Sequence, residues 1–311
     1  MADASGLGDA LAWRTLRLRL GPLVGVAAGT FDELQEGIDM NQADKAARFR
    51  ALHEAPSAFV IANAWDAGSA RVLAGVGMVA LATSSGATAN VLGRRDGAVS
   101  RDEAMAGAQA VAEGCDLPVS GDLENGYGHD TQGVVQTIQR AAQAGLVGGS
   151  IEDFSGDAAQ PIYPLPQALQ RIEAAVQAAR ALPWPFTLTA RSEGLLHGKH
   201  GLDETITRLL AFERAGADVL MAPGLPDLDA VRKVCAALRK PFNFMAGIRG
   251  KSFSVAELQA AGVKRISLAT SLYRAAMTGL AEAAREAQSS GTFTYLDRCM
   301  PSGELSKMMK G

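Results

Sequence analysis

Eight short runs of apolar and β-branched residues recur along the chain, and a stretch with helical character follows each one. They cover residues 59–66, 78–85, 118–124, 148–154, 185–193, 218–224, 241–247 and 265–272. Regular alternation of strand and helix is typical of α/β folds with a parallel sheet. Eight such units in about 250 residues favour a closed (β/α)8 TIM barrel over an open doubly wound sheet. No GxGxxG follows the first run, so the dinucleotide-binding alternative lacks its main support.

The stretches between the runs carry signals for helix start and stop. Residues 101–113 are alanine-rich and amphipathic, and Ser100 with Glu103 matches a capping box. Similar stretches cover residues 167–181, 202–215 and 255–261. Several of them end at glycine, which favours helix termination.

The two ends of the chain do not follow this alternation. Residues 1–40 contain several arginines and a short apolar run, a pattern that faintly suggests a signal peptide. Asp3 and Asp9 spoil the pattern, and the apolar run is too short to cross a bilayer. We therefore expect residues 1–40 to be an extension outside the fold. Residues 41–311 should form a single barrel domain with a C-terminal helix and tail.

Composition and charge exclude several kinds of partner. The chain has 311 residues, a formal net charge of −3 and a pI near 5.9, so it has no basic field to attract nucleic acid or a membrane surface. The three cysteines, Cys115, Cys235 and Cys299, are far apart and lack metal-ligand spacing. They fit a reducing cytoplasm, as small core residues. We expect a cytoplasmic protein.

Acidic residues gather where the third, fourth and fifth strands should end. In a barrel these ends share one mouth, which carries the chemistry. The charged residues at these three ends are Asp122, Glu124, Glu152, Asp153, Arg191 and Glu193. Neighbouring carboxylates are costly unless something positive lies between them. The pattern predicts a metal or anion site, and oxygen ligands favour Mg²⁺ or Mn²⁺ over zinc.

Other polar residues are weaker candidates. Asn243 lies in the seventh run and could contact a substrate. All four histidines fall in expected loops or helix ends, and we expect His53 and His197 to be solvated. His129 follows the turn at Tyr127 and is a candidate to face the site.

Six motifs in a fixed order resemble the isocitrate lyase and phosphoenolpyruvate mutase (ICL/PEPM) superfamily. They are NAWDAGSAR, TSSGA, LGRRD, GDLENGYG, GGSIEDF and LTARSE, and the similarity covers residues 41–295. The resemblance is to the oxaloacetate decarboxylase, 2-methylisocitrate lyase-like and phosphonopyruvate hydrolase type. It implies a magnesium enzyme that forms a homodimer or homotetramer. The terminal helix, near residues 272–288, would pack on a neighbouring subunit.

The resemblance also implies site roles. Asp122 would bind Mg²⁺ directly, while Glu124 and Glu152 would hold metal-bound waters. The residues implied in catalysis are Asp96, Arg191 and Glu152. Trp65 would form a wall of the substrate pocket. Ser84 or Ser85, with Gly86 and Ala87, would bind the substrate carboxylate, and Arg191 would pair with a substrate oxygen or carboxylate. The spacing to Asp96 fits Ser84, whereas the Ser-Gly dipeptide fits Ser85.

Charge placement limits the chemistry that such a site can perform. A 2-oxo acid that chelates magnesium can take up the electrons of a breaking bond as a metal-stabilised enolate. Carbon–carbon cleavage, release of carbon dioxide and phosphorus–carbon cleavage share that intermediate. Two departures from the family pattern narrow the choice. Residues 154–164 lack the Lys-x-Cys-Gly-His loop of isocitrate-cleaving members, and Glu124 replaces the usual aspartate.

The leading hypothesis is a magnesium-dependent lyase or decarboxylase that cleaves a carbon–carbon bond of a small 2-oxo or 2-hydroxy di-acid. Its nearest rival is phosphonopyruvate hydrolase or mutase chemistry at a phosphorus–carbon bond. A third possibility is a binding module that holds a 2-oxo acid without turnover. The sequence leaves these three open.

Overall fold

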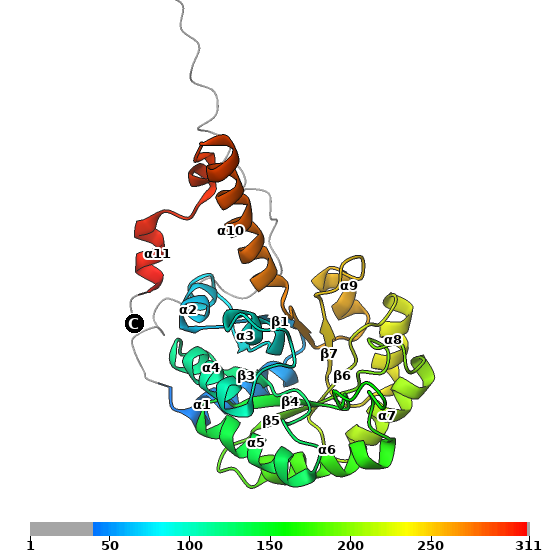
Figure 1. Cartoon of the computed structure of the whole chain (residues 1–311). Coiled ribbons are helices and arrows are strands. Elements are labelled where there is room, and N and C mark those ends of the chain that lie inside the picture. The colour runs from blue at the N-terminus through cyan, green and yellow to red at the C-terminus, as the bar shows by residue number, and fades with distance from the viewer. Residues whose placement is uncertain (1–39, 310–311) are drawn as a thin grey trace, which may run out of the picture. The chain divides into compact units, whose positions relative to one another are not determined.

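The computed structural model describes residues 40–309, whose eight strands form a closed parallel barrel (Figure 1). The strands follow chain order around the barrel, and β8 pairs with β1 to close it. They are β1 (Phe59–Asn63), β2 (Leu81–Ala82), β3 (Val119–Asp122), β4 (Gly148–Glu152), β5 (Thr187–Arg191), β6 (Val219–Met221), β7 (Phe242–Met245) and β8 (Arg265–Ser267). Each strand lies within one of the eight predicted runs. The TIM barrel prediction is therefore confirmed.

Helices surround the strands (Figure 1). They are α1 (Gln42–Glu54), α2 (Ala67–Gly75), α3 (Ser85–Val91), α4 (Arg101–Glu113), α5 (Thr131–Gln143), α6 (Leu165–Arg180), α7 (Leu202–Arg214), α8 (Leu228–Ala237), α9 (Val255–Ala260), α10 (Ser271–Ser290) and α11 (Ser302–Met308), with the 3₁₀ helix η2 (Thr294–Arg298). The capping box expected at Ser100 and Glu103 starts α4. The short helix α3, directly after β2, was not expected from the sequence.

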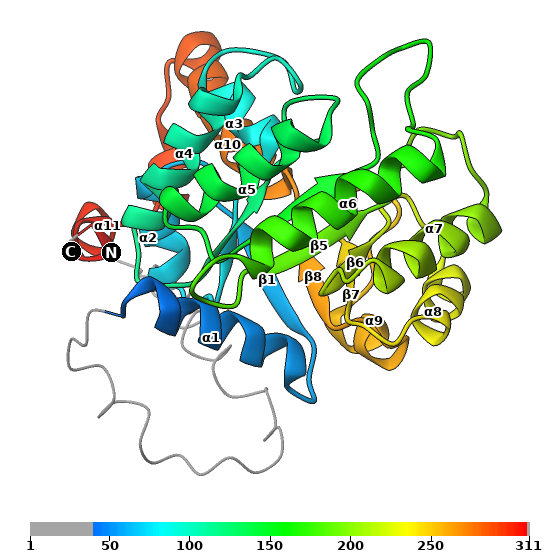
Figure 2. The same cartoon turned by 90° about the horizontal axis from the view of Figure 1, so that it is seen from below.

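Helix α1 packs at the N-terminal ends of the strands (Figure 2). Phe49 of α1 is fully buried and packs edge to face against Phe59, with ring centroids 6.5 Å apart. His53 is also buried, with edge-to-face contacts to Phe49 at 4.8 Å and to Phe59 at 5.0 Å. The expectation of a solvated His53 is therefore wrong. Because α1 packs against the N-terminal ends of the strands, His53 in its last turn points inward, while Glu54 at its end is exposed.

The main core fills the space between strands and helices. Leu123, Ile151 and Phe212 are buried there. Gly149 allows close packing, because a Cβ at this position would lie 2.5 Å from Cδ1 of Leu123. Cys115 and Cys235 pack against this core, as expected. Cys299 is exposed near the end of the chain, which contradicts its expected place in the core.

The C-terminal elements contribute little to this core, which Leu272 at the start of α10 contacts. Helix α10 has no buried residue and extends away from the ring of helices (Figure 1, orange). Met277 and Leu280 on α10 are exposed, as is Phe293 after it. Helix α11 contacts α2, where Arg71 Nη1 donates to the carbonyl oxygen of Met309 at 2.6 Å.

The predicted extension, residues 1–40, lies outside the described residues except for Met40. Within residues 40–309, no helix combines the length and the apolar character needed to cross a membrane.

Candidate active site

A cavity of about 200 Å³ opens at the C-terminal ends of the strands. Its lining includes Asp96, Asp122, Arg191 and Asn243, together with both Ser84 and Ser85. Barrel enzymes place their reactive groups at this end. The structure thus brings together residues that the sequence placed on five separate segments.

Arg191, the last residue of β5, lies at the centre of the acidic cluster. Its Nη1 is 3.4 Å from Oδ1 of Asp122 and 3.4 Å from Oε2 of Glu152. Its Nε donates to Oε1 of Glu193. All four side chains are at most 17% exposed. One guanidinium therefore serves three nearly buried carboxylates.

This shared cation leaves negative charge uncompensated. Burial raises the pKa of Glu152 well above its usual range, and Arg191 offsets only part of that rise because Glu193 and Asp122 repel the same carboxylate. Burial, with the charges of Asp122 and Asp96, raises the pKa of Glu124 to about 7. Burial is the largest influence on Glu193 and acts to raise its pKa, but the charges and hydrogen bonds of Arg191 and His197 together lower the pKa of Glu193 below its usual value. The cluster would be stabilised by a further cation.

The donor set fits magnesium held mainly through water. Within residues 40–309, no three His, Cys, Asp or Glu side chains lie close enough to coordinate one ion directly. Magnesium commonly keeps several waters and takes one or two protein carboxylates. Asp122 suits a direct ligand, because its Oδ2 accepts from the Ser85 N–H at 3.1 Å and its backbone N–H donates to Thr83 Oγ1 at 2.9 Å. Glu124 and Glu152 then fit positions that act through water.

The start of α3 forms one side of the site. Ser84 is its N-cap, and the Ser84 hydroxyl oxygen accepts from the Ala87 N–H at 3.4 Å. Gly86 is needed for close approach, because a Cβ there would lie 2.9 Å from Thr270 Cγ2 and 3.1 Å from Asp96 Oδ2. Both serines line the cavity, so the choice between them for a substrate carboxylate stays open.

Several predicted residues do not line the cavity. Trp65 packs edge to face against Tyr273 of α10, with centroids 5.2 Å apart. The lining of this cavity also does not include Gly86, Ala87, Glu124 or Glu152. His129 also lies outside it, and its Nδ1 is 2.7 Å from the hydroxyl of Tyr163. Asn243 does line the cavity, but its amide already bonds to Ser267 and Arg265.

Two residues in and around the site were missed from the sequence. Tyr127 bonds through its side chain to Glu124, and burial raises the pKa of Tyr127 above its usual value. The sequence signal that could have indicated Tyr127 is its position between two glycines, after Asp122 and Glu124. Arg265 lines the cavity floor from the start of β8. A charged residue opening an apolar run could have indicated it.

Backbone strain also concentrates at the mouth. The non-glycine residues with positive φ within the described part of the chain are Glu124 (48°), Tyr127 (55°) and Ala269 (49°). Each follows a strand end, on β3 or β8. Such strain persists where surrounding structure enforces it, and it clusters at functional sites.

An aromatic contact is among those that join the loop at residues 154–164 to the site. Phe154 stacks on His197, with rings 4.1 Å apart and nearly parallel. His197 is exposed, as expected, and its Nε2 is 3.6 Å from Oε2 of Glu193. The loop is thereby joined to Arg191 through Glu193.

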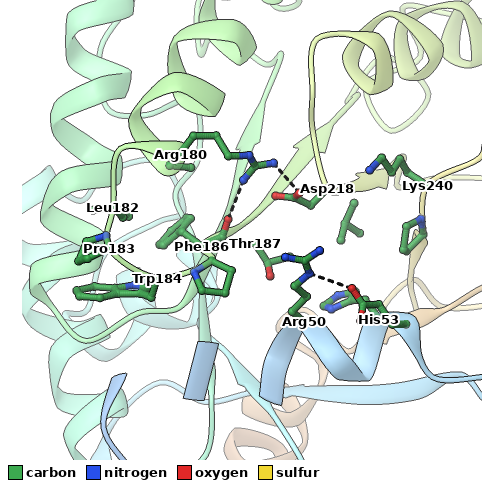
Figure 3. Close-up of a pocket in the computed structure, with 15 residues that line it drawn as sticks. Arg50, His53, Arg180, Leu182, Pro183, Trp184, Phe186, Thr187, Asp218 and Lys240 are labelled. Atoms are coloured by element: carbon green, nitrogen blue, oxygen red, sulfur yellow. Dashed lines mark hydrogen bonds and ion pairs between the residues drawn. The ribbon is translucent and has the colours of Figure 1, made fainter. Parts of the chain in front are cut away.

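A larger cavity, of about 520 Å³, opens at the opposite end of the barrel (Figure 3). Its two arginines are paired, Arg180 with Asp218 at 2.6 Å and Arg50 with Glu54 at 2.9 Å. Barrel chemistry lies at the C-terminal end. We therefore place the active site at the smaller cavity despite its size.

Several known proteins are similar to this chain. A candidate lyase/mutase of known structure from Burkholderia cenocepacia J2315 is 47% identical, with a TM-score of 0.85, over 87% of this chain and 97% of that one. Oxaloacetate decarboxylase of Chromohalobacter salexigens is 27% identical over 245 residues, 76% of this chain and 83% of that protein. The 2,3-dimethylmalate lyase of Eubacterium barkeri is 28% identical over 227 residues, 70% of this chain and 77% of that protein.

These names agree with the expected class of carbon–carbon lyases that act on small acids. A sequence profile described as phosphoenolpyruvate phosphomutase matches residues 49–288, most of the chain. The resemblance drawn from the six motifs is confirmed, and this chain belongs to the phosphoenolpyruvate phosphomutase family of the ICL/PEPM superfamily.

Proposed function

We propose that the protein is a magnesium-dependent lyase or decarboxylase that cleaves a carbon–carbon bond of a small 2-oxo or 2-hydroxy di-acid. The observation that carries the proposal is the cluster of Asp122, Glu152 and Glu193 around Arg191 beside a polar cavity. The names of the relatives support the bond type. Their different substrates leave the side chain of the acid open.

Each protein group has a definable task in this proposal. Bound magnesium would act as a Lewis acid on the substrate's carboxylate and keto oxygens. Asp122 would hold the ion, and the Ser85 N–H and Thr83 hydroxyl keep its carboxylate and backbone in place. Arg191 would bind a substrate oxygen, because its guanidinium is positioned by Glu193 and Glu152.

Phosphorus–carbon chemistry is the second candidate. The matching family profile is named after a phosphomutase, which favours keeping it. Isocitrate-type cleavage is not proposed, because residues 154–164 contain no Lys, Cys or His to serve as the proton donor of that loop. A binding module would keep the same groups without turnover.

A substrate panel tests the proposal. The protein is incubated with Mg²⁺ and oxaloacetate, alkylmalates or phosphonopyruvate, and 2-oxo acid products and released phosphate are measured. Pyruvate from oxaloacetate above the non-enzymatic rate, or a 2-oxo acid from an alkylmalate, supports the lyase. Phosphate from phosphonopyruvate alone supports the rival. Thermal stabilisation by these acids without product supports the module.

Two matched variants distinguish loss of the proposed metal ligand from a general effect of replacing an aspartate. Asp122→Asn should abolish turnover, because it removes the negative charge of the proposed direct ligand. Asp229→Asn, at a side chain 81% exposed on α8, should leave turnover unchanged. Equal activity of the two variants would show that the acidic cluster is not the reactive site.

A further inference from the structure

An arginine lies buried at the floor of the active-site cavity with only neutral partners. Arg265 is 4% exposed. Its Nε donates to Asn243 Oδ1 at 2.8 Å and its Nη2 to Thr189 Oγ1 at 2.8 Å. Its Nη1 is 3.4 Å from Nε2 of His53, the side chain that also borders the opposite cavity (Figure 3).

His53 does not supply a negative or positive charge to this contact. Its Nδ1 is 2.8 Å from the carbonyl oxygen of Phe49, which assigns the ring hydrogen to Nδ1 and leaves Nε2 to accept from Arg265. Burial and the charge of Arg265 lower the pKa of His53 to about 3. The imidazole is therefore neutral at pH 7.

The charge of Arg265 is left without a counter-ion. Among residues 40–309, no carboxylate lies within ion-pair distance of it, whereas Arg191 contacts three and Arg208 contacts Asp153 and Glu204. Burial lowers the pKa of Arg265 to about 9, so the guanidinium is still positive at pH 7. A buried unpaired charge is costly. A negatively charged ligand in the cavity would offset that cost.

The cavity connects this guanidinium to the acidic cluster. Its lining includes Asp122, Arg191 and Arg265, and it contains the small polar side chains of Ser120, Ser150 and Ser267 as well as larger ones such as Met221 and Met245. Bulky branched residues usually fill this part of a barrel. Small polar residues here leave space below the reactive end.

Strand geometry sets the depth of the guanidinium. Thr189 and Arg191 lie two residues apart on β5, so their side chains point the same way and are roughly 6.6 Å apart along the strand. Because Arg265 bonds to Thr189, its guanidinium lies about one layer of side chains below Arg191. A four-carbon acid has about 4.5 Å of carbon chain. That chain and one hydrogen bond of about 2.9 Å together cover roughly 7 Å, enough for an acid with one carboxylate beside Arg191 to reach Arg265 with the other.

We propose that Arg265 is a specificity-determining residue whose guanidinium binds the second carboxylate of a di-acid at the floor of the cavity. This proposal rests on the proposed function in one respect, namely that the first carboxylate lies at the Asp122 end. It assigns the preference for di-acids to one side chain. Asn243 becomes a positioning residue, because its amide oxygen holds Nε of Arg265.

A pair of matched ligands tests this assignment. Malate and 2-hydroxybutyrate share a carbon skeleton and differ by a carboxylate in place of a methyl group. Their affinities are measured by isothermal titration with Mg²⁺. The wild type should prefer malate. Arg265→Gln should weaken malate binding roughly 10- to 100-fold, as for loss of a hydrogen bond to a charged group. It should leave 2-hydroxybutyrate binding unchanged.

Arg171→Gln is the matched control variant. Arg171 is 2% exposed and donates to the carbonyl oxygens of Asn125 and Asp130, outside the cavity. Its substitution also removes a buried guanidinium from neutral acceptors, but it should leave the preference for malate intact. A similar loss of preference in both variants would overturn the proposal, because it would then reflect general destabilisation.

The remaining outcomes are also decisive. An unchanged ratio of the two affinities in Arg265→Gln overturns the proposal. If Arg265→Gln does not fold, a crystal structure of the wild type with malate and Mg²⁺ shows which residue the distal carboxylate of malate contacts. A distal carboxylate within hydrogen-bond distance of Arg265 supports the proposal, and one directed at the mouth overturns it. Turnover in the substrate panel is a separate readout. If no substrate is turned over but the preference for malate is lost only in Arg265→Gln, the proposed lyase activity is refuted. The assignment of Arg265 to the second carboxylate then still holds.

Discussion

Acidification should destabilise the protein through one buried imidazole. His53 has a lowered pKa of about 3 in the fold, against 6.5 in the unfolded chain. The cause is first its burial and then the nearby charge of Arg265, opposed by the hydrogen bond to Phe49. The unfolded state therefore binds more protons between these two values, and stability must fall as pH decreases through this window.

The magnitude follows from the two pKa values. At pH 5 the unfolded imidazole gains about 2 kcal/mol from protonation, while the folded imidazole at this pH gains almost nothing. At pH 7 both contributions are small. His53 should thus cost the protein about 2 kcal/mol of unfolding free energy between pH 7 and pH 5.

Urea unfolding at the two pH values measures this cost. Buried carboxylates with raised pKa values, such as Glu152, act in the opposite direction, so the test is the difference between wild type and His53→Gln. The glutamine oxygen can still accept from Arg265 but cannot titrate. The wild type should lose about 2 kcal/mol more than this variant. His197→Gln, at an exposed imidazole, should retain the wild-type loss. Equal losses in wild type and His53→Gln would refute the neutral buried imidazole.

Three further predictions concern the metal, the N-terminus and the assembly. Asp122→Ala should abolish the magnesium dependence of oxalate binding, measured by titration calorimetry. Glu124→Gln should weaken oxalate binding roughly 10- to 100-fold, as expected for a residue that contacts the metal through water. If magnesium still affects oxalate binding in Asp122→Ala, the ion is bound elsewhere. A chain that begins at Met40 should melt within a few degrees of the full chain by calorimetry, and a larger loss would show that residues 1–39 stabilise the barrel. Light scattering at micromolar concentration should show a dimer or tetramer, because α10 exposes Met277 and Leu280, the latter 63% exposed. Leu280→Glu should shift that mass toward the monomer, and a monomeric wild type would exclude the assembly.

The sequence by itself determined the barrel and the position of its acids. Strand and helix periodicity are local properties, so eight runs could be recognised from neighbouring residues alone. In a barrel the strand ends are neighbours, so the sequence alone predicts that Asp122, Glu152 and Arg191 lie close together, as they do. The capping box at Ser100 was equally local.

Only the tertiary structure decided which side chains are buried and what they contact. His53 and Arg265 lie 212 residues apart in the chain, and neither sequence neighbourhood shows that they meet. Trp65 turned to Tyr273 rather than to the cavity for the same reason. The charge balance at Arg265 depends on every segment that packs around it. Periodicity reports which face of an element is apolar, but the partner of a buried polar group is chosen by packing between segments remote in sequence.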